Sequence, residues 1–522
     1  MVDISFIYHK SSWLLQYPVD LNRPLHQHQQ PKISLLVDLC ARKIVQDSST
    51  TKRVVSIIPH ELYYNLMKAA LLLSKDRAIE VLICHWPWRC LSLQKLAPDL
   101  FDTVTVLYDD TYFADRMRTA VKYTTCLTHT FVECLKRRAP TKLCSLDLSG
   151  FPVAEVIVNY LSSHVMLVYN EERQRQIIGE YNRVTQHWPQ EEKQLYHLDT
   201  TLPDDKFVIY LDAFVEANDT HMELCRALKT TRSDASQFKL CVRRLDLSSM
   251  QIARIVVLLE QVDPEHFTGV SLQYTALLKE EGLVLLSEVM GRLHNLTSLD
   301  LSCNNIMASK DPATCRLLSE TLSCLPRLSR LDLSNNRTEH KLRQLLKNVQ
   351  RPLEYLRICA CGVRESDLYY LAASHHASAL RHLDISENWF GRKIPAVLVL
   401  LKSVAPTLQV LEMEDCDLEA SDMDTMLALC PMLACMRYWN IGYNNQLRSA
   451  LMLEHIENFV QMAQLQALQL SFPADCFGSQ QDENNILDKT QFSCSFVARM
   501  GLLCERAGRP NIAVHIIGDG YV

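Results

Sequence analysis

Residues 293–306 read LHNLTSLDLSCNNI, and residues 325–336 read LPRLSRLDLSNN. Both fit the pattern LxxLxLxxNxI, and the fitting residues are Leu296, Leu299, Leu301, Asn304 and Ile306 in the first stretch and Leu328, Leu331, Leu333 and Asn336 in the second. This is the leucine-rich-repeat pattern, in which each repeat contributes one short strand and one return segment. One such unit cannot bury its apolar face, so the pattern predicts a stack of repeats.

The same phase continues on both sides of these stretches, at spacings of 25 to 32 residues. The second leucine position is held by Leu245, Val270, Leu299, Leu331, Leu356, Leu383, Leu411, Trp439 and Leu468. The turn position is held by Met250, Thr275, Asn304, Asn336, Cys361, Asn388, Cys416, Asn444 and Pro473. Repeats of this length leave room for a helix on the convex side. The predicted fold class is therefore α/β, a leucine-rich-repeat solenoid (horseshoe) with an α-helical N-terminal cap.

Five segments are predicted along the chain. Residues 1–30 are expected to be a flexible lead, and residues 31–140 a helical N-terminal domain. Residues 141–240 hold an isolated first repeat, LCSLDLSGFPV from Leu143, then a helical insertion and a candidate strand, KFVIYLDAF from Lys206. Residues 241–480 form the regular repeats. Residues 481–522 are expected to supply a polar loop, a helix and a capping strand, NIAVHII.

Composition excludes several classes of protein. The 522 residues carry a net charge of −6, which gives no general attraction to nucleic acid or to anionic membranes. No run of about 18 apolar residues is present, so no transmembrane helix is expected. The 19 cysteines, in a long chain without a secretory signal, predict reduced thiols and a cytoplasmic or nuclear location.

Motifs for catalysis are not found in the sequence. There is no GxxxxGK[ST], HExxH, GxSxG or Cys-x-x-Cys. Cys359 and Cys361 are two residues apart, but Cys361 falls on the turn position of a repeat. We therefore predict a protein that is not an enzyme, with no cofactor and no metal, that works through protein partners.

Two further stretches resemble a known family. IIPHELYYNLMKAALL followed by RAIEVLICHWPWRCLSL, and the later PLEYLRICACGVRESDLYYLAASHHASALRHLDISEN, resemble the PRAME family, most closely its leucine-rich-repeat-containing protein 14 branch. The resemblance covers roughly residues 55 to 480. It implies a cytoplasmic or nuclear, non-catalytic horseshoe. Some members are similar to substrate receptors of cullin-2 ubiquitin ligases, held through elongin C in the elongin B/C pair. The branch is associated with damping Toll-like-receptor and NF-κB signalling, which implies masking of a pathway kinase or scaffold as the alternative function.

Specific residues near the N-terminus fit the interpretation as a ubiquitin-ligase substrate receptor. Elongin-binding boxes have the form Leu-xxx-Cys-xxx-aliphatic on a helix, which Leu36, Cys40 and Ile44 fit. The cullin-2 box that follows is apolar-Pro-xx-apolar-xxx-apolar, and the fitting residues are Ile58, Pro59, Leu62 and Leu66. Receptors usually have a small residue where this chain has Leu35. The alternative is that both segments are the amphipathic core of a helical cap, because apolar residues four apart describe any such helix.

The concave face is the other candidate site. Side chains that flank the core leucines of each strand point away from the core. The candidates are Arg244, Asp300, Arg330, Asp332, Tyr355, Arg357, His382, Asp384, Glu412 and Tyr438. Its carboxylates could favour a basic partner segment, or they could simply remain solvated. The aromatic residues and arginines are the better anchors for an interface.

Overall fold

The structure is a computed structural model that describes residues 10–17, 36–98, 100–101, 104–136, 141–169, 207–232, 238–275, 280–391, 394–444, 458–460, 462–471, 495 and 498–517. The chain divides into two compact units. Unit 1 comprises Met1–Trp13, Gln29–Phe101 and Phe113–Val270, and unit 2 comprises Leu14–His28, Asp102–Tyr112 and Ser271–Val522. Each unit is described by itself.

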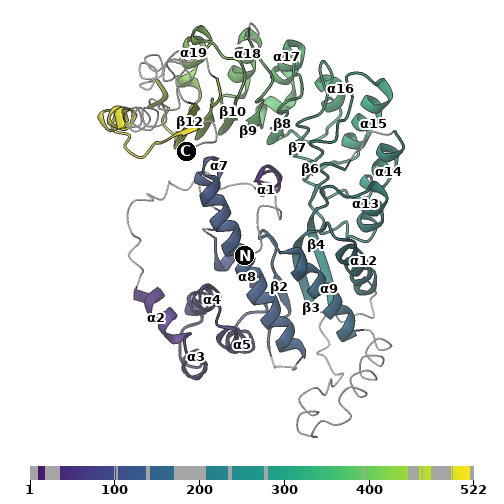
Figure 1. Ribbon diagram of the computed structural model, residues 1–522, viewed down its shortest axis with the longest axis vertical. Coiled ribbons are helices and arrows are strands. Elements are labelled where there is room, and N and C mark those ends of the chain that lie inside the picture. The colour runs from purple at the N-terminus through teal and green to yellow at the C-terminus, as the bar shows by residue number, and fades with distance from the viewer. Residues whose placement is uncertain are drawn as a thin grey trace, which may run out of the picture. The chain divides into compact units, whose positions relative to one another are not determined.

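Unit 1 combines helices with the first strands of the repeat array (Figure 1). Its helices are α2 (Leu36–Ile44), α3 (Ser48–Val55), η2 (His60–Leu62), α4 (Tyr63–Leu72), α5 (Asp76–Cys84), α6 (Leu93–Leu96), most of α8 (Asp110–Lys136), α9 (Glu155–Tyr169), α12 (Asn218–Thr231) and α13 (Ile252–Leu259). Its strands are β1 (Cys90–Ser92), β2 (Ser145–Asp147), β3 (Phe207–Phe214), β4 (Phe238–Asp246) and the first two residues of β5 (Gly269–Ser271). Strands β1 to β4 pair in parallel and in sequence order.

The strand of the first repeat and the strand that begins after Lys206 are confirmed, but the first repeat is not isolated, because β2 pairs with β1 on one side and with β3 on the other. Leu146 lies in β2 and is fully buried, and β3 pairs with β4 over its whole length. The structure differs from the prediction within residues 31–140, the predicted helical domain. Leu91 lies in β1, pairs with Leu146 and is fully buried, so the repeat stack begins before residue 141.

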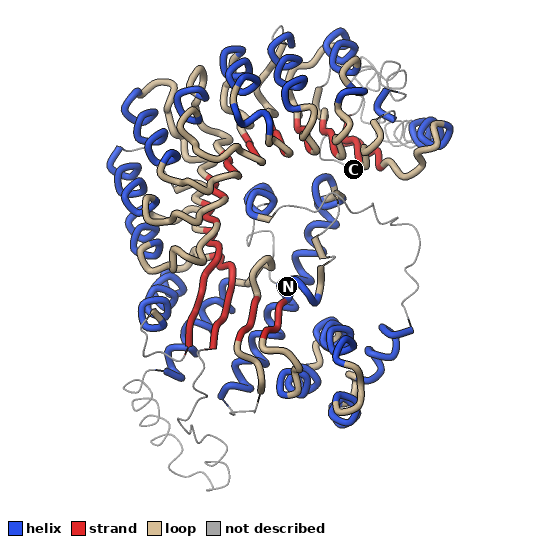
Figure 2. The backbone as a smooth tube through the Cα atoms, turned by 180° about the vertical axis from the view of Figure 1, so that it is seen from behind, coloured by secondary structure: helices blue, strands red, loops and turns tan. Residues whose placement is uncertain are grey.

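Unit 2 contains the regular repeats. Its helices are α7 (Thr105–Tyr108), α14 (Glu280–Met290), α15 (Pro312–Ser323), α16 (Leu342–Leu346), α17 (Glu365–Ala373), η3 (His375–Ser378), α18 (Ile394–Val404), α19 (Ala420–Leu427) and η4 (Cys430–Met432). Its strands are β6 (Ser298–Asp300), β7 (Arg330–Asp332), β8 (Tyr355–Arg357), β9 (His382–Asp384), β10 (Val410–Glu412), β11 (Tyr438–Asn440), β12 (Ala467–Ser471) and β13 (Ala513–Ile517). Figure 2 shows these strands along one face of the repeats of unit 2 and helices α14 to α19 along the other.

The predicted phase of the repeats in unit 2 is confirmed. The parallel strands pair so that one core position faces the next, for example Leu299 with Leu331 and Leu411 with Trp439. Each of the nine residues predicted at the second leucine position is fully buried, including Leu245 and Val270, which belong to unit 1. The predicted capping strand is also present, since β13 pairs with β12 from Ala467↔Ala513 onward.

The turn positions form a ladder of side-chain hydrogen bonds. Asn304 donates from Nδ2 to the carbonyls of Leu272 (2.7 Å) and Leu301 (2.9 Å), and its Oδ1 accepts from the backbone N–H of Thr275 (2.8 Å). Asn336, Asn388 and Asn444 repeat this arrangement. Where cysteine replaces asparagine, the Sγ of Cys361 donates to Leu333 O at 3.1 Å. The ladder therefore satisfies buried backbone groups that the tight turn leaves without partners. Pro473 lies outside the described residues.

The lead of residues 1–30 is not uniformly featureless. Residues Lys10–Gln16 form helix α1, in which Trp13 and Leu15 are buried. In unit 1, the ring of Trp13 lies 4.3 Å from that of Phe101 and 5.6 Å from that of Phe113. The prediction of a flexible lead is therefore wrong for these seven residues, because an apolar run of this kind stabilises a helix once tertiary partners bury it.

Candidate functional site

Three short helices near the N-terminus of unit 1 build the candidate site. Asp47 caps α3, accepting hydrogen bonds from the backbone N–H of Ser49 (3.4 Å) and Thr50 (2.8 Å). Hydrogen bonds from the Ser49 and Thr50 hydroxyls hold the pKa of Asp47 well below its usual range. Asp47 lies three residues after the end of α2 at Ile44, and α3 begins at the next residue, so only a short turn separates the two helices.

Helix α4 is fixed by aromatic side chains that follow α5. Tyr63 donates its hydroxyl to Val55 O at 2.6 Å, which joins the start of α4 to the end of α3. The rings of Tyr64 and Trp88 lie 4.8 Å apart, and those of Trp86 and Trp88 lie 5.3 Å apart. Trp86 also donates from Nε1 to Cys90 O at 3.1 Å. The Trp-Pro-Trp segment thereby ties α4 to the first strand of the repeats.

Helix α2 presents apolar side chains to solvent. Leu36 is 75% exposed, Leu39 is 50% exposed and Val37 is 44% exposed. Cys40 is also exposed, whereas Ala41 and Val45 are buried in the core. A contiguous exposed apolar face on a short helix is typical of a surface that another protein covers.

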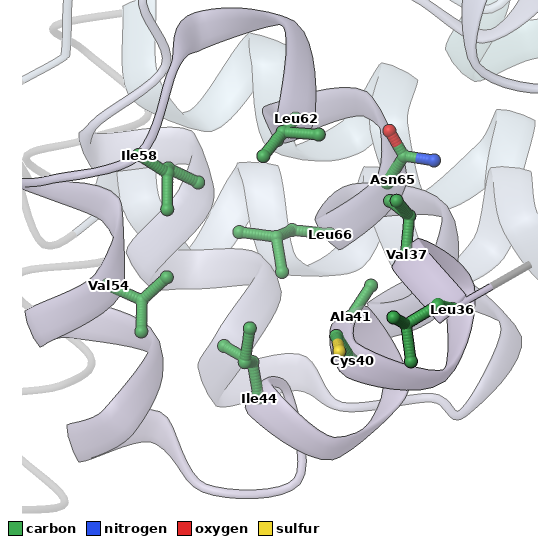
Figure 3. Close-up of a pocket in the computed structure, with 10 residues that line it drawn as sticks. All are labelled: Leu36, Val37, Cys40, Ala41, Ile44, Val54, Ile58, Leu62, Asn65 and Leu66. Carbon is green, nitrogen blue, oxygen red and sulfur yellow. The ribbon is translucent and has the colours of Figure 1, made fainter.

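A cavity of about 220 Å³ opens between α2, α3 and α4. It is lined by Leu36, Val37, Cys40, Ala41, Ile44, Val54, Ile58, Leu62, Asn65 and Leu66, shown in Figure 3. Six of the seven residues predicted for the elongin-like and cullin-2-like boxes are in this lining. The structure thus brings together two segments whose spacing in sequence had suggested separate contacts.

The lining residues differ in burial, which bears on the two alternatives left open by the sequence. Leu66 is 3% exposed and belongs to the core of the helical region. Leu36 lies four residues, or about one helical turn, before Cys40, and it stands largely in solvent. Ile44, Ile58 and Leu62 are half-buried. Pro59 does not line the cavity; it precedes η2 and fixes the turn into α4.

The concave residues of unit 2 have partners within the chain. Arg357 contacts Asp332 (3.1 Å) and Asp384 (2.8 Å), and His382 contacts Glu412 (2.8 Å). Asp300 accepts a hydrogen bond from Gln273 at 2.7 Å. Asp300, Asp332 and Asp384 are at most 1% exposed. The expectation that these carboxylates face solvent or a partner is therefore wrong for the three aspartates.

Segments from the N-terminal part of unit 2 contact the same face. Arg330 donates to the carbonyls of Leu15 and Leu14, the latter at 2.7 Å, and its guanidinium lies 4.5 Å from the ring centre of Tyr355. The ring of Tyr438 stacks on Tyr108 at 6.3 Å. Tyr355 and Tyr438 are each 1% exposed, so the two predicted aromatic anchors are covered.

The sequence interpretation missed these contacts. The only signals were the apolar run Trp13–Leu15 and the apolar Val106–Leu107 beside Tyr108. In unit 1, the remaining concave candidate, Arg244, lies 3.8 Å from Asp212.

Burial alters the acidity of this cluster. Burial raises the pKa of Asp332 to about 6, with Arg357 opposing the shift and Asp300 adding to it. The pKa of Asp384 is raised for the same first reason, and Arg357 again opposes the change. A single guanidinium therefore contacts two buried carboxylates, and loss of that cation would leave both without their ion-pair partner.

One group of side chains has the composition of a metal site. Donor atoms of Cys241, Asp263 and His266 lie within 4.8 Å of one another in unit 1. However, the Lys239 ammonium is 2.7 Å from Asp263, and burial raises the pKa of Cys241 to about 11. The ion pair accounts for the carboxylate, and the thiol stays protonated, so the arrangement does not favour a cation. In the parts of the chain that the structure describes, no helix is long and apolar enough to cross a membrane.

Comparison with known proteins gives consistent relatives. Leucine-rich repeat-containing protein 14 of Xenopus laevis is 25% identical over 471 residues, covering 85% of this chain and 88% of the relative. The protein of the same name from Mus musculus is 25% identical over 453 residues, with the same coverage. A solved structure, the yeast Rad7 and Elc1 complex, is similar with a TM-score of 0.40 and 12% identity, covering 88% of this chain and 100% of that chain.

The family model described as the PRAME C-terminal domain matches residues 207–499, which is more than half of the chain. Those residues include strands β3 to β12 of the array. The fold is a leucine-rich-repeat solenoid with a helical N-terminal region, as the sequence predicts. The chain belongs to the PRAME family.

Proposed function

We propose that this chain is the substrate-recognition subunit of a cullin-2 ubiquitin ligase. Helix α2 binds elongin C, the segment Ile58–Leu66 contacts cullin-2, and the repeats bind the substrate. The chain acts by binding and catalyses no step itself. The partner assignment comes from the resemblance of the two segments to elongin and cullin-2 boxes.

One observation carries the proposal. Leu36 is 75% exposed on a helix whose Cys40 and Ile44 line an apolar cavity with Ile58 and Leu62. A leucine that served only the cap core would be buried, as Leu66 is. An exposed leucine beside an apolar cavity provides both a side chain that a partner can bury and a cavity that can receive a partner's side chain. Full burial of one leucine contributes about 1.5–3 kcal/mol to binding.

The test is co-purification of the full chain with elongin B, elongin C and cullin-2. We expect the wild type to retain all three partners. Leu36→Ser is expected to weaken elongin C binding by about 10- to 100-fold, since roughly 1.4 kcal/mol corresponds to a factor of ten. Leu36→Ser combined with Pro59→Ala is expected to abolish the complex.

Ile57 supplies a matched control. Ile57 is 80% exposed and immediately precedes Ile58, but it does not line the cavity. Ile57→Ser should therefore leave elongin C binding unchanged. A folded wild-type chain that retains no elongin C, or a Leu36→Ser variant that binds as well as the wild type, would contradict the proposal.

A further inference from the structure

The cavity between α2 and α4 contains a nucleophilic atom, the Sγ of Cys40. Figure 3 shows this sulfur just below Ala41, between Ile44 and Leu36. Cys40 is an exposed residue, so a small molecule can reach the thiol from solvent. A thiol at the mouth of an apolar hollow differs from a surface thiol, because the hollow can hold the apolar part of a reagent against it.

The lining defines which compounds fit. Among the ten lining residues, Asn65 alone carries an amide, and its Nδ2 donates to Asp38 at 3.4 Å. The rest of the lining offers carbon and one sulfur. A dry apolar cavity of about 150 Å³ holds benzene. The volume of about 220 Å³ here suits a single aromatic ring or a short alkyl chain.

We propose that this cavity is a binding site for small apolar α,β-unsaturated carbonyl compounds, which then add covalently to Cys40. The thiol loses its proton to solvent, and the sulfur forms a bond to the β-carbon of the bound compound. The carbon–carbon π bond breaks, and its electron pair passes to the α-carbon as an enolate, which takes a proton from water. The reaction is an addition, so there is no leaving group and no change in oxidation state that needs another reagent.

Other cysteines provide an internal comparison. In the described ranges the exposed cysteines are Cys40, Cys90 and Cys324. Cys324 caps the end of α15 in unit 2 and does not line the cavity. Because Cys324 is also exposed, it reports the intrinsic reactivity of a compound toward a solvent-accessible thiol of the same chain.

The experiment compares two acrylamides that differ only in the length of the alkyl group. The full-length protein is treated separately with N-methylacrylamide and with N-hexylacrylamide, and labelling rates at each cysteine are measured by peptide mass spectrometry. Each buried methylene strengthens binding by about fourfold. We therefore expect the hexyl-to-methyl rate ratio at Cys40 to exceed the ratio at Cys324 by at least about tenfold.

Two neighbouring isoleucines separate the cavity from general surface hydrophobicity. Ile58 lines the cavity and is half-buried, whereas Ile57 is 80% exposed and does not line it. Ile58→Asn should lower the hexyl-to-methyl ratio at Cys40 by about fivefold or more, because burying an amide without a partner disfavours an alkyl chain beside it. Ile57→Asn should leave the ratio unchanged. Equal ratios at Cys40 and Cys324, or equal effects of the two variants, would overturn the proposal.

Cys40 lies in the same cavity as the proposed docking surface. Addition to Cys40 does not depend on the proposed function, but the effect of that addition on elongin C binding rests on it. If α2 binds elongin C, an adduct at Cys40 fills the groove and prevents that contact. Labelling is measured on the chain without partners. If the chain shows the expected rate ratio but retains no elongin C, the cavity site is supported and the receptor function is contradicted. If the chain retains elongin C but does not show the rate ratio, the receptor function is supported and the cavity site is contradicted.

Discussion

The Nε of Arg357 donates a hydrogen bond to Oδ2 of Asp384 at 2.8 Å, and the carboxylate side chain is only 2% exposed. The same guanidinium contacts Asp332 at 3.1 Å from the neighbouring strand. Arg357 therefore crosslinks three consecutive repeats through charge. Arg357, Asp332 and Asp384 were candidates for binding a partner, but in the structure they bind one another and stabilise unit 2.

Removal of this guanidinium should destabilise the protein strongly. We expect Arg357→Met to lower the free energy of unfolding by about 3–5 kcal/mol at pH 7, because two buried carboxylates lose their cation. The control is Arg351→Met, whose ion pair with Glu354 is surface-exposed and should contribute about 0–1 kcal/mol. Urea unfolding followed by circular dichroism measures both. Similar losses for the two variants would show that the buried pair has no special role.

The same variant should become less destabilised in acid. Burial already raises the pKa of Asp332 to about 6 with Arg357 present, and loss of the arginine raises it further. A carboxyl with a folded-state pKa above its unfolded-state value binds its proton more tightly in the folded protein. Stability is then gained as pH falls through the folded-state pKa. The difference between Arg357→Met and wild type should shrink from pH 7.5 to pH 5, and a constant difference would exclude this explanation.

Leu36 and Leu66 both line the cavity between α2, α3 and α4, but their mutation should change the free energy of unfolding by very different amounts. Leu36→Ser is expected to change the free energy of unfolding by less than about 0.5 kcal/mol, because the side chain is 75% exposed. Leu66→Ser should cost about 3–5 kcal/mol, because the side chain is 3% exposed and a hydroxyl would replace packed carbon. Thermal unfolding of the two variants is the measurement. A large loss for Leu36→Ser would assign this residue to the core.

The asparagine ladder should tolerate cysteine better than alanine. Asn304→Ala removes hydrogen bonds to the buried carbonyls of Leu272 and Leu301, for an expected loss of about 2–3 kcal/mol. Asn304→Cys should lose about half as much, since Cys361 at the equivalent position donates its thiol to Leu333 O. Equal stability of the two variants in urea unfolding would mean that the thiol makes no useful contact.

Cys84 should react with alkylating reagents near neutral pH. A hydrogen bond from Cys134 lowers the pKa of the Cys84 thiol to about 7, against the opposing effect of burial. Because the thiolate is the nucleophile, the rate of alkylation by iodoacetamide should reach half its maximum near pH 7. Cys134→Ala should move this midpoint to higher pH. An unchanged midpoint in that variant, measured by peptide mass spectrometry, would exclude the hydrogen bond as the cause.

The sequence by itself determined the repeat stack. The apolar positions recur with one phase, and the residues predicted at the second leucine position, from Leu245 to Leu468, are all buried. The asparagines of the ladder were also identifiable, because their role depends on a short turn whose partners lie one repeat away. Local periodicity is enough for such contacts, since each repeat touches mainly its neighbours.

Only the tertiary structure decided which predicted site residues remain accessible. Leu36 and Leu66 have the same apolar chemistry and similar helical spacing, yet one is exposed and the other is core. Arg330 contacts Leu14, 316 positions away in the chain, and no periodic pattern encodes that pairing. Exposure depends on which distant segment packs over a side chain, and that depends on the folded arrangement of the whole unit rather than on local sequence.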